Sequence, residues 1–308
     1  PGDSWDYTAT QHMILADIEI DGALRKVIMQ APKNGFFYVI DRTTGEFISA
    51  NNFVPMNWAS HVDPETGRPV EIQETNHKSQ PALTTPGPLG GHNWHPMSYS
   101  PKTGLVYIPA QETLFIYSTD KEFEYNPGTW NTAQINEMTY LPKDPDELAM
   151  VDSATLGYLL AWDPIAQREV WRAQYKRPWS GGVLSTDGNL VFQGTSDGRF
   201  VAYAADSGDL LWSMDTGQGI VAPPITYKID NEQYVAVQVG YGGVYALMGG
   251  FEAANENPER DGRMMVFKIG GEQLEKPVKT IVQMNPTLVE MNSDALTIAR
   301  GEYEYYEH

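Results

Sequence analysis

Residues 157–171 read G-Y-L-L-A-W-D-P-I-A-Q-R-E-V-W, and two other stretches of the chain repeat this pattern. They are G-F-F-Y-V-I-D-R-T-T-G-E-F-I-S at 35–49 and G-R-F-V-A-Y-A-A-D-S-G-D-L-L-W at 198–212, and the three superimpose without a gap. Each begins with glycine, passes through apolar and aromatic residues, turns at polar residues and then resumes an apolar run. This pattern predicts two strands joined by a tight turn.

The spacing of these units indicates a repeat architecture. The start positions 157 and 198 differ by 41, and position 35 precedes 157 by 122, which is close to three such steps. A matching earlier strand is expected at 104–110, 189–195 and 233–240. A period of about 40 residues with several short strands is typical of β-propeller blades. The sequence therefore predicts an all-β fold, a β-propeller of four-stranded blades.

The repeat divides the chain into about four blades. We expect them at 12–56, 95–175, 180–215 and 219–270, with an insertion at 113–156 inside the second. The first blade offers no clear innermost strand, and an open sheet edge invites aggregation. Four blades can close a ring, but the missing strand favours a fragment whose other blades lie upstream; the resemblance given below implies that the full ring has eight. Residues 1–270 are then propeller, and the less regular 271–308 lie outside it.

Composition limits the partners of this chain. Its formal net charge is −19, from 40 acidic and 21 basic residues, which argues against binding to nucleic acid or to an anionic membrane surface. It has no cysteine, so disulfides, thiolate metal sites and covalent haem attachment within it are excluded. Apolar stretches are too short for a transmembrane segment. Because the chain begins at Pro1 rather than Met, we expect a processed or cut form.

Several segments contain more polar and aromatic chemistry than blade scaffolding needs. They are S-W-D-Y (4–7), A-P-K-N-G (31–35), P-L-G-G-H-N-W-H-P-M (88–97), R-P-W-S-G-G (177–182) and V-G-Y-G-G-V-Y (239–245). The last three follow one another at blade intervals, so we expect them to face the same pore. A flat aromatic ligand suits them, because glycine allows close backbone approach, an indole offers a π face, and amide and charged groups address a polar rim.

Together these segments resemble the quinoprotein alcohol dehydrogenases, eight-bladed propellers that hold pyrroloquinoline quinone (PQQ) and calcium on the propeller axis. The resemblance runs from Asp3 to about Ala246, in the C-terminal part of that family's propeller domain. The repeat units also resemble the family's tryptophan docking motifs. Trp171 and Trp212 stand in the docking place, where such residues join neighbouring blades and do not touch the cofactor.

The resemblance implies a role for four residues. Asp6 would be the catalytic base and a calcium ligand, and Lys33 would bind the quinone's ortho-dione and stabilise its developing negative charge. Asn93 would bind the polar edge of PQQ, and Trp179 would contact its ring system. The family's other calcium ligands and an adjacent cysteine pair lie upstream of the matching Asp and have no counterpart here, so this chain alone would form an incomplete site.

The implied activity is the oxidation of alcohols to aldehydes with hydride transfer to the quinone. Lanthanide-using relatives carry a second Asp two residues after the base; Thr8 occupies that position here, so calcium is expected. The alcohol itself is not set by the sequence. Aromatic residues of the 113–156 insertion, namely Phe115, Tyr117, Trp130 and Tyr140, are expected to roof the pocket.

The end of the chain suggests where the electrons go. Residues 271–308 resemble the linker that leads into a cytochrome c domain in the quinohaemoprotein branch of the family. We therefore expect haem c on an extension beyond His308, or else a separate cytochrome as acceptor. A protein of this kind is expected in the periplasm.

Two alternatives stay open at this stage. His92 and His95 form an i, i+3 pair that could bind a metal, although Pro96 and nearby glycines disfavour a helix and make polar packing the better interpretation. The whole chain could also be a non-catalytic propeller of related repeats that acts as a scaffold for protein assembly. Such a scaffold needs the blades but not Asp6, Lys33, Asn93 and Trp179 in phase.

Overall fold

The computed structural model describes residues 3–78, 80–128, 131–135, 144–246 and 262–272. Residues 1–269 form one compact unit, and every helix and strand reported below lies in it. Only residues 270–272 are described in the rest of the chain, so the expected linker at 271–308 lies almost wholly outside the described residues.

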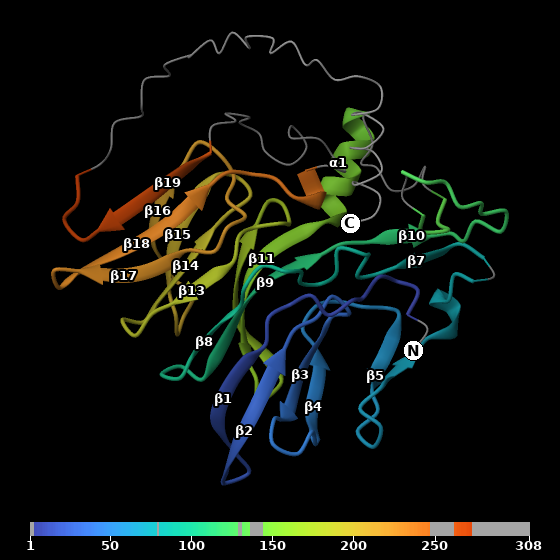
Figure 1. The fold of residues 1–308 in the computed structure, drawn as a ribbon, viewed down its shortest axis with the longest axis horizontal. Helices are drawn as coiled ribbons and strands as arrows, with labels where there is room; N and C mark the ends of the chain where they lie inside the picture. The colour runs from blue at the N-terminus through green and yellow to red at the C-terminus, as the bar shows by residue number, and fades with distance from the viewer. Residues whose placement is uncertain (1–2, 79, 129–130, 136–143, 247–261, 273–308) are drawn as a thin grey trace, which may run out of the picture. The chain divides into compact units, whose positions relative to one another are not determined.

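Four antiparallel sheets follow one another along the chain (Figure 1). The first contains β1 (Ile14–Ile20), β2 (Ala23–Gln30), β3 (Phe36–Asp41) and β4 (Phe47–Asn52). The second contains β8 (Ser98–Ser100), β9 (Leu105–Glu112), β11 (Leu156–Asp163) and β12 (Arg168–Tyr175). The third contains β13 (Val183–Ser185), β14 (Leu190–Gly194), β15 (Arg199–Ala204) and β16 (Leu210–Asp215). In the fourth, β17 (Ile225–Ile229), β18 (Glu232–Val239) and β19 (Arg263–Lys268) are described.

These sheets confirm the predicted propeller blades. The three superimposable sequence units are the hairpins β3–β4, β11–β12 and β15–β16. Each hairpin has a β-bulge at an equivalent repeat position, after Val39, Ala161 and Ala202. A bulge bends its strand and increases the local twist. The three units that align without a gap therefore share a bend in the strand as well as a sequence pattern.

The prediction that the first blade lacks its innermost strand is wrong. β1 pairs with β2 in antiparallel register, so the first sheet has all four strands. The turn between them is Asp21-Gly22, and both residues have positive φ, 52° and 76°. An Asp-Gly pair in this conformation matches the twist of the flanking strands and is a strong hairpin signal. That dipeptide could have revealed β1 from the sequence.

Neighbouring blades are joined by apolar side chains from their facing sheets. One buried cluster joins the first and second sheets, one the second and third, and one the third and fourth. Trp171 of β12 lies over Gly208 of the third sheet and donates an indole hydrogen bond to the carbonyl of Ala205, at 3.0 Å. Trp212 of β16 contacts Phe267 of β19, with 5.4 Å between ring centroids. Both tryptophans therefore join neighbouring blades, as predicted.

Shorter elements lie between the blades. They are β5 (Ala59–Val62), β6 (Pro69–Glu71), the 3₁₀ helix η1 (Gln73–Thr75), β7 (Ala82–Thr84), β10 (Phe115–Tyr117) and α1 (Pro145–Ala154). β10, from the 113–156 insertion, pairs with β7. Two of the aromatic residues expected to roof a pocket, Trp130 and Tyr140, lie outside the described residues. Among the described helices, none has the length and apolar character needed to cross a membrane.

The docking of Trp171 on Gly208 gives a direct test of blade packing. A Cβ at Gly208 would lie 2.7 Å from the indole, whereas a Cβ at Gly45, the equivalent residue of the first blade, would meet nothing within 4 Å. Both glycines have φ of +77°, so both changes to alanine carry the same backbone strain of about 1–2 kcal/mol. Gly208→Ala should lower the free energy of unfolding by about 1–3 kcal/mol more than Gly45→Ala does. Urea denaturation of the two variants measures this difference. Equal losses in the free energy of unfolding would show that the close contact between Trp171 and Gly208 does not contribute to stability.

Candidate active site

The structure joins the first two predicted site residues directly. Lys33 Nζ lies 2.9 Å from Asp6 Oδ2, and the two side chains form an ion pair. The Lys33 side chain is 9% exposed and that of Asp6 is 61% exposed. The lysine is therefore fixed in the protein while the carboxylate faces the outside, where a small molecule can reach it.

Asp6 is presented by the residues on either side of it. Trp5 is buried, and its carbonyl accepts a hydrogen bond from the Tyr117 hydroxyl at 2.7 Å. The Tyr7 hydroxyl donates to the carbonyl of Pro86 at 2.5 Å, and the Asp3 carboxylate accepts bonds from the backbone N–H groups of Trp5 and Tyr7. Asp6 itself has φ of +62°. The chain is thus anchored on both sides and turned so that the intervening carboxylate points at Lys33.

Lys33 lies in a tight turn that is docked on the glycines of the 88–97 segment. Gly91 N–H donates to the Lys33 carbonyl at 2.9 Å. A Cβ at Gly90 would lie 2.5 Å from Lys33 Cα, so only glycine permits this approach. Behind the turn, the Trp58 indole donates to the Asn34 carbonyl at 2.8 Å. The backbone of the turn that carries Lys33 is therefore held from both sides, and Asp6 holds the ammonium group at its end.

Asn93 and Trp179 lie in loops connected to the same glycine segment. Asn93 is buried; its amide donates to the Leu89 carbonyl at 2.8 Å and accepts from Trp94 N–H at 2.9 Å. Trp179 is 2% exposed, packs in one apolar cluster with Leu89, and stacks on Tyr245 with 6.1 Å between centroids. Its φ is +66°, a conformation that bulky residues rarely adopt and that occurs mainly where surrounding structure imposes it.

These contacts bring the three odd loop segments together, as predicted. Residues of 88–97, 177–182 and 239–245 share one apolar cluster, and His95 lies edge-on to Trp179 at 4.8 Å. Two buried ring nitrogens there, Trp179 Nε1 and His95 Nε2, have no hydrogen-bond partner among the described residues. Buried polar atoms are normally paired, so two unpaired nitrogens on rings that contact each other suit a polar ligand. With the Lys33 ammonium, this set fits a flat quinone with an acidic rim.

The same residues do not make a complete metal site. Among the residues that the structure describes, no three His, Cys, Asp or Glu side chains gather as a metal cluster. Calcium takes six to eight oxygen ligands, and Asp6 could supply only part of such a shell.

His92 of the His92–His95 pair has a packing role in this structure. His92 is fully buried, and its ring nitrogens lie 2.7 Å from the Ala31 carbonyl and 2.6 Å from the His95 carbonyl. Both nitrogens therefore face backbone oxygens and neither is available to a metal. Burial lowers the pKa of His92 to about 4, against the opposing effect of the two carbonyls, and burial lowers the pKa of His95 to about 3.

One buried residue that the sequence analysis did not identify also belongs to this region. Gln111, near the end of β9, is 3% exposed and forms hydrogen bonds to the 88–97 segment and to Trp179. Its position gives a weak sequence signal, a glutamine at the end of the apolar run L-V-Y-I-P-A. Polar residues at such positions are usually exposed, so burial could not be expected from the pattern alone.

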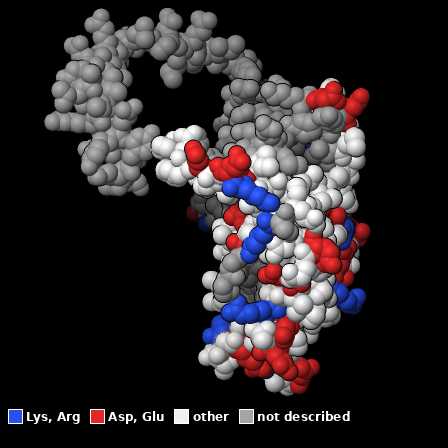
Figure 2. All heavy atoms as spheres, turned by 90° about the vertical axis from the view of Figure 1, so that its right-hand side faces the viewer, with Lys and Arg blue, Asp and Glu red and all other residues white. Residues whose placement is uncertain are grey.

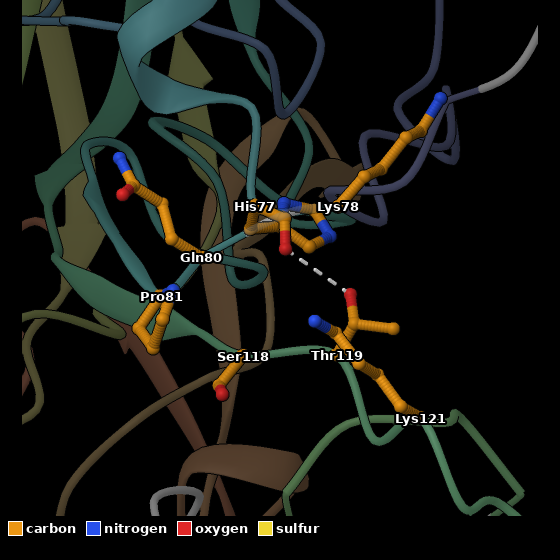
Figure 3. A pocket seen from close by; sticks show the side chains of 7 residues that line it. All are labelled: His77, Lys78, Gln80, Pro81, Ser118, Thr119 and Lys121. Atoms are coloured by element: carbon orange, nitrogen blue, oxygen red, sulfur yellow. Dashed lines mark hydrogen bonds between the residues drawn. The ribbon is translucent and has the colours of Figure 1, made fainter.

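A small cavity lies elsewhere, next to His77, whose ring is 6.1 Å from that of Trp5 between centroids. It has a volume of about 200 Å³ and is lined by His77, Lys78, Gln80, Pro81, Ser118, Thr119 and Lys121. Thr119 donates a hydrogen bond to the His77 carbonyl across it, and Lys78 and Gln80 extend away from this bond (Figure 3). None of the predicted site residues lines it, and its polar groups do not converge on one point.

The chain is similar to known proteins in both sequence and structure. The family model of the PQQ glucose/ethanol/alcohol dehydrogenase β-propeller domain matches residues 2–57 and 153–235. The quinohemoprotein alcohol dehydrogenase of Comamonas testosteroni is 53% identical over 256 residues, which cover 80% of this chain and 35% of that protein. The 1-butanol dehydrogenase (cytochrome c) of Thauera butanivorans is 46% identical over 314 residues, covering 98% of this chain and 43% of that protein.

Solved structures give the same result. The quinohemoprotein alcohol dehydrogenase ADHIIG of Pseudomonas putida HK5 superimposes with a TM-score of 0.85 at 43% identity, covering 91% of this chain and 42% of that one. A europium-containing methanol dehydrogenase superimposes with a TM-score of 0.74 at 30% identity, covering 87% and 49%. The chain thus spans less than half the length of these relatives.

The buried histidines predict how stability depends on pH. A free histidine has a pKa of about 6.5, so between pH 6.5 and 4.5 the unfolded chain takes up protons that the folded His92 and His95 do not. The free energy of unfolding should therefore fall as pH is lowered through this range, by about 2 kcal/mol for each ring. His95→Gln should reduce the difference between pH 7 and 4.5, measured by urea denaturation. The control is His61→Gln at an exposed position, and an unchanged pH difference in the His95 variant would contradict the assignment.

Proposed function

The chain belongs to the family of PQQ-dependent alcohol dehydrogenases, and we propose that the protein oxidises alcohols to aldehydes with PQQ and calcium as cofactors. The observation that carries this proposal is the 2.9 Å ion pair between Lys33 and Asp6. Lys33 packs on the 88–97 segment, and Asn93 and Trp179 contact Leu89 of the same segment. A scaffold propeller requires none of these contacts, which favours the enzyme over the alternative of a protein-assembly scaffold.

Asp6 is proposed as the base that accepts the proton of the alcohol hydroxyl. A general base must lie within hydrogen-bonding reach of that proton. The Asp6 side chain is exposed and Lys33 engages one of its oxygens, so the other oxygen is available to an alcohol. The turn at Asp6, anchored by Trp5 and Tyr7, keeps the carboxylate from swinging away.

Lys33, Asn93 and Trp179 are proposed to hold the quinone. Among the described residues Lys33 has one hydrogen-bond partner, Asp6, so two of its three donors remain for a ligand. Asn93 would address the polar edge from its loop, and Trp179 would offer an indole face and its unpaired N–H. PQQ would supply the hydride acceptor for alcohol oxidation, and these residues of the chain would position it and supply charge.

Lys33 is suited to stabilise negative charge on the quinone. Its ammonium group is buried, and a charge-assisted hydrogen bond is stronger where water is excluded. Acidic side chains are prominent on the face of the molecule in Figure 2, and basic ones are dispersed among them. In a chain of net charge −19, a fixed cation at this point provides the attraction for an acidic cofactor.

Electron transfer and location are proposed on the resemblance alone. Haem c on an extension beyond His308, or a separate cytochrome, would accept the electrons; support comes from the names of two relatives, a quinohemoprotein and a cytochrome c-dependent 1-butanol dehydrogenase. A periplasmic location is proposed on the same resemblance. The identity of the alcohol is left to a substrate panel on the full-length protein.

Replacing the base tests the proposed activity. Asp6→Asn keeps the shape of the side chain but removes its ability to accept a proton, so kcat in the full-length protein loaded with PQQ should fall by about 10²–10⁴. The variant should still fold and show quinone absorbance, with a somewhat lower melting temperature, because an amide offsets the burial of the Lys33 charge less than a carboxylate does. The measurement is dye reduction with a primary alcohol, and Asp17→Asn on the surface of β1 is the control. Turnover close to that of the wild type would remove Asp6 from this role.

Metal choice can be tested in the same assay. Thr8 stands where lanthanide-using relatives carry a second Asp, so activity of the metal-depleted full-length protein should return with calcium. Lanthanum should restore no more activity than calcium does, and Thr8→Asp should shift the preference towards lanthanum. Selective activation of the wild type by lanthanum would contradict calcium.

A further inference from the structure

Gln111 connects two parts of the site that otherwise belong to different blades. Its side-chain Nε2 donates to the carbonyls of Leu89 and Gly90, at 3.2 and 3.1 Å. Its Oε1 accepts the backbone N–H of Trp179 at 3.2 Å. One buried amide therefore joins the 88–97 segment to the 177–182 segment.

The chemistry of the amide matches these partners. A primary amide has two N–H donors and one carbonyl acceptor, and here both donors face backbone carbonyls while the acceptor faces a backbone N–H. A glutamate would place a carboxylate oxygen opposite two carbonyl oxygens. A methionine would have a similar length and form none of the three bonds. Glutamine is thus the residue that satisfies all three groups at once.

The amide acts on both sides of the quinone site. On one side, Gly90 and Gly91 pack on Lys33, so a shift of this segment would move the ammonium group. On the other side, Trp179 holds an uncommon left-handed backbone conformation, and its N–H is bonded to Gln111. By accepting this N–H, Gln111 also helps to maintain the left-handed conformation of Trp179.

We propose that Gln111 is a positioning residue that fixes Trp179 relative to the loops carrying Lys33 and Asn93. Gln111 does not touch the cofactor. It sets the spacing between the Trp179 indole and the Lys33 ammonium group, which face the cofactor. This inference rests on the proposed binding of PQQ at these residues. It predicts that Gln111 affects PQQ binding through Trp179.

The first measurement is PQQ affinity in the full-length apoprotein, followed by quinone absorbance. Gln111→Met and Gln111→Glu should each weaken PQQ binding at least about tenfold, because both lose the bonds to Leu89 and Gly90. The matched control is Tyr107→Phe, in the same strand, which removes a buried hydroxyl bonded to the Ala205 carbonyl away from the site. It should lower the melting temperature about as much as Gln111→Met while leaving PQQ affinity within about twofold.

The second measurement is a double-mutant cycle with Trp179→Phe. If Gln111 acts through Trp179, then adding Gln111→Met to Trp179→Phe should weaken binding by much less than it does in the wild type. If the fold-losses in PQQ affinity of the two single variants multiply in the double variant, this inference is overturned and the proposed function stands. The same holds if PQQ affinity is unchanged in both Gln111 variants. Failure of the wild-type protein to bind PQQ would overturn the proposed function as well. Having two Gln111 variants keeps the test decisive if one of them does not fold.

Discussion

The site depends on the contact between the flat faces of neighbouring sheets. Strands this short are not stable alone, so each sheet must bury an apolar face against a neighbouring element. The second sheet shows this most clearly, since β9 and β11 are buried almost throughout, whereas β16 of the third sheet is mostly exposed. Trp171 spans one such contact with its ring over Gly208 and its N–H on the Ala205 carbonyl. Because this packing fixes each blade relative to the next, it also fixes the loops that leave the ends of the strands.

Those loops turn a repeated scaffold into a specific site. The strands of each blade follow one pattern, but the segments holding Asp6, Lys33, Asn93 and Trp179 do not repeat. They are held by contacts that are individually weak and mutually dependent: glycines under Lys33, a buried amide under Trp179, and aromatic anchors on both sides of Asp6. The uncommon backbone conformations of Asp6 and Trp179 persist because these surroundings hold them. Loops positioned by a rigid scaffold are where binding groups are commonly found.

Much of this arrangement could be predicted from the sequence. The hairpins at 35–49, 157–171 and 198–212 can be predicted because apolar residues and turn residues recur at one spacing. The docking tryptophans stand at fixed positions of this repeat. β1 was missed because its Asp-Gly turn lies outside that repeat. α1 and β10 lie inside the insertion, and β7, the partner of β10, lies between the first two blades, so no repeat guides the interpretation of these elements. Gln111 could not be found because its role depends on three backbone groups that folding brings together.

The Asp6–Lys33 pair shows why a site of this kind needs both its residues in unequal environments. An ammonium group that is almost fully buried loses its hydration, and a nearby carboxylate offsets part of that cost. The carboxylate is itself exposed, so it keeps access to solvent and to any hydroxyl that arrives from outside. If both groups were buried, no alcohol could reach the base; if both were exposed, water would screen the attraction between Lys33 and an anionic ligand. The aromatic anchors around Asp6 and the glycines around Lys33 maintain this difference in burial, and the proposed roles require it: an exposed Asp6 to accept a proton and a buried Lys33 to hold charge in place.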